Sequence, residues 1–169
     1  GEEDGLEYVI VEGDPRNPEM GQQDEYPGYP LHSALSSDIA DGDKIAALVM
    51  SNENMLLEPA ANGYLPVHVA IENERYEYLH LVLTGRCITV QFYQEQSMLN
   101  PLIFAIWRGA SFKCLEIILT LFPESRSLVD SKDHQAPIHH LILNLASDEY
   151  LTKLLKRSLE VHRLNKIQG

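Results

Sequence analysis

The chain has 169 residues, 44% of them hydrophobic, and a formal net charge of −12. This length and apolar content fit one domain with a sizeable core. The acidic balance argues against nucleic acid or an anionic membrane surface as the main partner, because phosphate recognition needs clustered Lys and Arg, and no apolar run approaches the roughly 20 residues that span a bilayer.

The first 25 residues form an acidic segment ahead of the rest of the domain. Residues 1–28 carry nine acidic residues and a single basic one, Arg16, which is the composition of a solvated tail. Within it, Glu7–Glu12 encloses a β-prone run of four, and we expect this run to cap the unit that follows. The alternative is that it adds as a strand to a partner's sheet edge, since it resembles the short motifs that bind small ubiquitin-like modifiers.

Two features indicate the cellular setting. The acidic start lacks the pattern of a secretory signal peptide, and two cysteines are fewer than a small secreted domain usually carries. We therefore expect an intracellular protein, cytoplasmic or nuclear. Cys114 lies on an apolar stripe and is predicted to be a core residue, whereas Cys87 follows Arg86 in a predicted loop, where the cation would lower the thiol pKa.

A fourfold repeat follows the acidic segment. Short segments share one pattern, a proline followed by an aliphatic residue and in three cases by histidine, and they begin at Pro30, Pro66, Pro101 and Pro137, at spacings of 36, 35 and 36 residues. A second landmark keeps a similar period, namely the apolar pairs Leu48-Val49, Val82-Leu83, Ile118-Leu119 and Leu154-Leu155. Two landmarks in phase indicate repeated structural units.

Each unit is predicted to contain two helices. Proline fits the first helical turn, where its missing N–H would have no partner, and apolar residues follow at helical spacing, as in Val67, Ala70 and Ile71. A polar break and a second amphipathic helix come next, and Gly85 is placed to end a helix in the left-handed conformation. We place the repeats near 26–60, 61–95, 96–131 and 132–157, with a C-terminal capping helix or tail over 158–169.

These residues resemble the ankyrin repeat, whose signature is Thr-Pro-Leu-His-x-Ala. The resemblance covers about residues 26–157 and is best at Leu65–Ala70, although the signature threonine is replaced in every unit and the glycine expected between the helices appears only as Gly109. A tetratricopeptide stack has a similar period, but it does not place Pro-aliphatic-His at the head of each unit. The resemblance implies an all-α ankyrin-repeat solenoid of stacked helix pairs.

Ankyrin arrays bind proteins, so the resemblance implies a protein or peptide partner, held in a concave groove by the turns between repeats and the exposed side of each first helix. By position these residues are Asn62, Tyr64, Glu72, Asn73, Ser97, Leu99, Trp107, Arg108, Asp133, Gln135, Leu143 and Asn144. We rank Trp107, Arg108 and Tyr64 first, because Trp, Tyr and Arg carry much of the binding energy at interfaces. The alternative for Trp107 is that it packs against a neighbouring repeat.

Histidines are the residues most suggestive of chemistry, and the resemblance accounts for three of them. In ankyrin repeats the histidine at the positions of His32, His68 and His139 bonds loop backbone and steadies the turn. His139 and His140 point about 100° apart on a helix, and no cysteine or carboxylate spacing completes a site around His134. We therefore predict no metal, no cofactor and no catalytic activity, in a protein expected to be a monomer.

The last part of the chain gathers basic residues beside apolar ones, at Lys153, Lys156, Arg157, Arg163 and Lys166. We expect them on the solvated face of a final helix, and contact with an acidic partner or with the chain's own acidic segment is the alternative. For the chain as a whole, the alternatives to a binding module are the repeat segment of a larger scaffold, channel or enzyme, used for intramolecular regulation or assembly, and an enzyme whose site no motif reveals.

Overall fold

The computed structural model describes residues 23–145 and 148–168 of the chain. Within these residues the secondary structure consists of α-helices and 3₁₀ helices, with no strand. The prediction of an all-α protein is therefore confirmed for the described part of the chain. The prediction for Glu7–Glu12 lies outside the described residues.

Each repeat proline begins a helix. Pro30, Pro66, Pro101 and Pro137 are the first residues of α1 (Pro30–Ser36), α3 (Pro66–Glu72), α6 (Pro101–Trp107) and α8 (Pro137–Leu145). The remaining α-helices are α2 (Gly42–Ser51), α4 (Leu79–Val82), α5 (Val90–Glu95), α7 (Phe112–Leu121) and α9 (Asp148–Ile167). Short 3₁₀ helices occupy Glu53–Leu57, Tyr76–Tyr78, Gly85–Ile88 and Pro123–Ser127. The proline sterics that favour a first helical turn thus act at all four positions.

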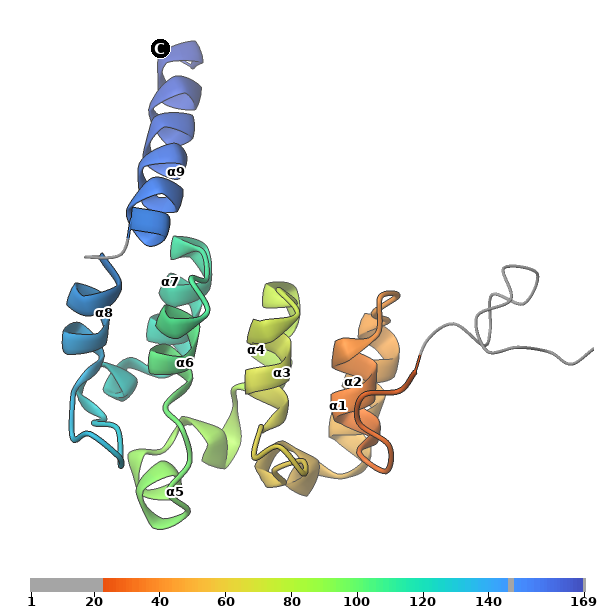
Figure 1. The fold of residues 1–169 in the computed structure, drawn as a ribbon. Coiled ribbons are helices and arrows are strands. Elements are labelled where there is room, and N and C mark those ends of the chain that lie inside the picture. The colour runs from red at the N-terminus through yellow and green to blue at the C-terminus, as the bar shows by residue number, and fades with distance from the viewer. Residues whose placement is uncertain (1–22, 146–147, 169) are drawn as a thin grey trace, which may run out of the picture.

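The helices stand side by side in a row of pairs (Figure 1). Helix α1 contacts α3, α3 contacts α6 and α6 contacts α8, so the four proline-led helices follow one another. Each also contacts the helix that comes after it, in the pairs α1 with α2, α3 with α4, α6 with α7 and α8 with α9. The apolar faces of neighbouring pairs bury one another, as repeat architectures require.

Two histidine hydrogen bonds at equivalent places join successive pairs. The His32 Nε2–H donates to the Tyr64 carbonyl at 2.8 Å, and the His68 Nε2–H donates to the Leu99 carbonyl at 2.8 Å. The third pair has no histidine here, and Asn100 instead donates to the carbonyls of residues 125 and 128 at 2.8 and 2.9 Å, within its own repeat. His32 and His68 thus bond the backbone of the next unit, whereas the Nδ1 of His139 accepts from the Ala136 N–H at 3.1 Å.

The turn inside a pair is also repeated. Glu74 and Gly109 both have left-handed backbones, with φ of 56° and 62°. The next residue's N–H then donates back to the first helix, from Arg75 to Ala70 at 2.8 Å and from Ala110 to Ala105 at 3.0 Å. The glycine that the repeat resemblance calls for is thus replaced in the second pair by a glutamate in a conformation that costs non-glycine residues about 1–2 kcal/mol.

The core runs through the row along both layers of helices. Side chains with at most 1% of their surface exposed come from each of the first three pairs, including Leu31, Leu35, Ile45, Leu65, Val67, Ile71, Leu79, Val82, Ile103 and Ile118. Ala70 and Ala105 are fully buried where the paired helices approach. Cys114 is fully buried as predicted.

The segment after the second pair differs from the expectation. Helix α4 ends at Val82, and Gly85 (φ 57°) begins a 3₁₀ helix instead of ending an α-helix. Cys87 lies in that 3₁₀ helix, is fully buried and donates to the Leu56 carbonyl at 3.2 Å. Burial raises the pKa of the Cys87 thiol to about 12, so the prediction of a pKa lowered by Arg86 is wrong. The desolvation of the thiolate outweighs the nearby cation.

Helix α9 continues without a break through the expected boundary between 157 and 158. It projects beyond the row of pairs (Figure 1), and Leu155, Leu159 and Leu164 expose 60–62% of their surface. No helix of the described residues is long and apolar enough to cross a membrane.

Candidate functional site

The highest-ranked side chains of two successive pairs meet on one surface. The Arg108 Nη2 lies 2.8 Å from the Glu72 Oε1 and donates to the Tyr64 hydroxyl at 2.7 Å. Tyr64 precedes α3, Glu72 ends α3, and Arg108 caps the end of α6. We call these three residues the arginine cluster. The structure thus brings together residues that the sequence places up to 44 positions apart.

Aromatic rings of the core pack against the arginine cluster and hold it in place. The Arg108 guanidinium lies 5.1 Å from the centre of the Phe104 ring, within the range of a cation–π contact. Tyr64 and Phe104 meet edge to face with centroids 5.1 Å apart, and His68 lies 5.0 Å from Phe104. Because Phe104 and His68 are buried, the exposed Arg108 guanidinium packs against rings that belong to the core.

Burial also sets the charge state of His68. It lowers the pKa of His68 to about 4, and the hydrogen bond to the Leu99 carbonyl opposes this only in part. His68 is therefore neutral at pH 7. Its Nδ1 accepts from the Leu65 N–H at 3.0 Å, which places the ring proton on Nε2.

Trp107 belongs to a second group of side chains, beside the arginine cluster. It exposes 45% of its surface, and its indole N–H donates to the His140 Nδ1 at 3.0 Å. The His140 Nε2 lies 3.6 Å from the Asp133 Oδ2. The ring therefore packs on α8, as the alternative for Trp107 predicted, while almost half of it faces outward, and its role in partner binding stays a prediction. We call Trp107, Asp133 and His140 the tryptophan cluster.

The other candidates serve the backbone or lie apart from the two clusters. The Asn73 and Asn144 side chains donate to carbonyls of their own helices, at 2.9 and 3.1 Å. The Leu99 side chain packs against the core, and the backbone of Gln135 bonds within its turn. Leu143 exposes 64% of its surface. In the remaining two turns, Asn62 bonds the Tyr26 hydroxyl, and Ser97 is exposed with a left-handed backbone.

Sequence reasoning missed Asp130 and set His140 aside as a metal ligand. Both are buried, and the structure places them with Asp133 in a group of two carboxylates and one imidazole that could hold a metal ion. The residue types Asp-x-x-Asp followed by a histidine seven positions later are the signal in the sequence. That spacing belongs to no known metal motif, and it becomes informative only when the turn brings Asp130 back toward α8.

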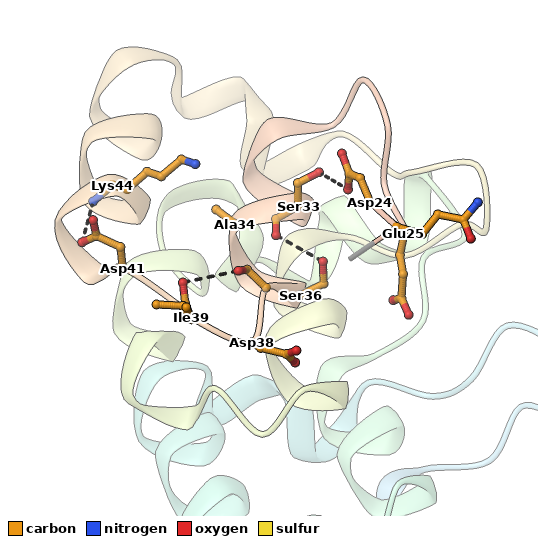
Figure 2. Close-up of a pocket in the computed structure, with 11 residues that line it drawn as sticks. Asp24, Glu25, Ser33, Ala34, Ser36, Asp38, Ile39, Asp41 and Lys44 are labelled. Atoms are coloured by element: carbon orange, nitrogen blue, oxygen red, sulfur yellow. Dashed lines mark hydrogen bonds between the residues drawn. The ribbon is translucent and has the colours of Figure 1, made fainter. Parts of the chain in front are cut away.

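A surface depression of about 430 Å³ lies elsewhere, at α1 and the start of α2 (Figure 2). Its lining includes Asp24 and Asp41, but both carboxylates already serve the local structure. Asp24 accepts from the Ser33 hydroxyl at 2.6 Å, which lowers the pKa of Asp24, and Asp41 accepts from two N–H groups of α2. Two carboxylates that line the depression are therefore already engaged in the local structure.

In comparisons with known proteins, no family model, no curated protein and no solved structure matches the chain.

Proposed function

We propose that this chain is an ankyrin-type repeat domain that binds a protein or peptide through the arginine cluster and the exposed edge of Trp107, without catalysing a reaction. The observation that carries the proposal is the convergence of Tyr64, Glu72 and Arg108 from two successive helix pairs on one exposed surface. Such a surface presents a fixed guanidinium beside two aromatic rings, and these residue types dominate interface energetics.

The energies favour a binding role for Arg108 over a stabilising one. Its side chain is 43% exposed, and an exposed ion pair stabilises a fold by about 0–1 kcal/mol. An arginine already held by Glu72 and Tyr64 loses less conformational freedom when a partner binds, which favours affinity. Substitution at Arg108 should therefore affect binding more than folding.

Substitution of Trp107 tests the binding role less directly than substitution of Arg108. Changing Trp107 and Arg108 together to alanine would also remove the indole bond to His140 and leave a buried ring nitrogen unsatisfied, which costs about 1–3 kcal/mol. A loss of binding in that double variant would therefore be mixed with a loss of stability, and Arg108 alone separates the two effects.

The test is selection of peptides from a random displayed library against the full chain, followed by affinity measurement on Arg108→Glu. We expect at least about 30-fold weaker binding, the effect of losing a 2 kcal/mol hot spot. Lys113→Glu is the matched control, since it reverses an exposed cation at the start of α7. Equal losses in both variants, or full affinity in Arg108→Glu, would contradict the proposal.

A further inference from the structure

Three polar side chains converge where the turn before α8 meets α8. Asp130 and Asp133 lie in the turn, and His140 lies in the helix. One ligand atom from each of these residues lies within 4.8 Å of the other two. The group therefore offers two carboxylate oxygens and one imidazole nitrogen to a single point.

The backbone orients both carboxylates. The Asp130 Oδ1 accepts from the Lys132 N–H at 2.7 Å, and the Asp133 Oδ1 accepts from the Gln135 N–H at 2.9 Å. Each carboxylate thus has one oxygen fixed by the turn and keeps the other, Oδ2, for a further interaction. Fixed outer contacts of this kind hold metal ligands in the orientation that coordination needs.

Two of the converging atoms are buried without a hydrogen bond. Asp130 and His140 are 5% and 4% exposed, and within the described part of the chain neither the Asp130 Oδ2 nor the His140 Nε2 has a hydrogen bond. A buried polar group left in this state costs about 1–3 kcal/mol, and a charged one costs more. A cation between them would satisfy both atoms.

We propose that Asp130, Asp133 and His140 bind a divalent transition-metal ion of the Zn²⁺ type. Imidazole nitrogen with carboxylate oxygen suits Zn²⁺, whereas Mg²⁺ and Ca²⁺ prefer oxygen ligands alone. Ligands around a tetrahedral Zn²⁺ are roughly 3.3 Å apart, so the 3.6 Å between the His140 Nε2 and the Asp133 Oδ2 needs only a small contraction. The Asp133 side chain is 41% exposed, which gives the ion a route in and leaves positions for water.

The site is coupled to Trp107 through a proton on His140. Because the indole N–H can only donate, the His140 Nδ1 that accepts from it carries no proton, and Nε2 does. Zn²⁺ binds Nε2 when the single ring proton moves from Nε2 to Nδ1 by exchange with water, so that the ring stays neutral. Two N–H groups would face each other, so the indole bond breaks when the ion binds. Trp107 is the single tryptophan of the chain, and its fluorescence reports the event.

The experiment is calorimetric titration of the full chain with ZnCl₂, with tryptophan emission followed in parallel. Excess Mg²⁺ is present to occupy sites made of carboxylates alone. We expect one Zn²⁺ per chain and a change in Trp107 emission that saturates at the same ratio. Asp133→Asn keeps the oxygen that accepts from Gln135 and should weaken Zn²⁺ binding by at least about tenfold.

Two further variants complete the test. His134→Asn is the matched control, because it removes an exposed imidazole outside the group at a left-handed position that asparagine tolerates, and Zn²⁺ affinity should not change. Trp107→Phe removes the competing donor, so affinity should be equal or higher. The proposal fails if Zn²⁺ leaves the emission unchanged, if Asp133→Asn binds as tightly as the parent, or if Trp107→Phe binds at least tenfold more weakly. Circular dichroism of each variant shows whether the helices are intact.

Discussion

Histidine has several distinct roles in this chain, and its surroundings determine each one. His32 and His68 are buried and bond the next unit's backbone, whereas His140 accepts from an indole and faces two carboxylates. Burial lowers the pKa of both His32 and His68. The protein therefore favours the neutral form of these two rings, and protonation acts against folding.

His68 makes the stability of the protein depend on pH. The unfolded chain binds a proton at this ring below its ordinary pKa of 6.5, while the folded chain binds it only below about 4. Stability is therefore retained above pH 6.5 and falls as the pH drops toward 4, by about 3 kcal/mol. We expect urea unfolding between pH 7 and 4.5 to be less pH-dependent in His68→Asn, by about this amount. Equal pH dependence in both proteins would show that His68 is not buried in its neutral form.

At the scale of the secondary-structure elements, the turn inside each helix pair joins the two helices in one repeated geometry. Glu74 and Gly109 occupy equivalent left-handed positions and give the same backward hydrogen bond to the first helix of the pair. Only glycine adopts this conformation without a steric penalty. The second pair is therefore held in its geometry by tertiary contacts, including the Arg75 hydrogen bond to the Ser37 carbonyl at 2.7 Å, against a local preference.

Glu74→Gly should stabilise the protein by about 1 kcal/mol, because it relieves the left-handed strain of a side chain that is exposed. Gly109→Ala, at the equivalent turn, should destabilise it by about the same amount. The unfolding free energies of the two variants, measured in urea at neutral pH, test both predictions. Changes of the same sign in both would contradict the equivalence of the two turns.

At the scale of the whole molecule, the helix pairs are joined in sequence order, so the stability of such a row is close to a sum of pair and interface contributions. The proline-led starts of α1, α3, α6 and α8 were predictable, because proline geometry acts locally. The burial of Cys87 was not, because it depends on contact with Leu56, 31 residues away. Helix α9 was predicted as two parts, because the repeat period set the expected boundary between 157 and 158. That boundary did not rest on a helix-ending residue.

The candidate site divides in the same way. That Tyr64, Glu72 and Arg108 share one surface was predictable from their positions in the repeat, because corresponding parts of similar units face the same way. Their role in binding a partner stays a prediction. The contact between Trp107 and His140 and the convergence of Asp130 with Asp133 were not predictable. They depend on the path of the turn before α8, which includes His134 in a left-handed conformation, and residue spacing does not reveal that path.

Hydrogen exchange of the full chain, with and without a selected peptide, tests the central claim most directly. We expect the peptide to slow exchange of amides in 61–65, 72–75 and 107–110, which surround the arginine cluster. Protection confined to the depression at α1 and α2, or to α9, would contradict the account.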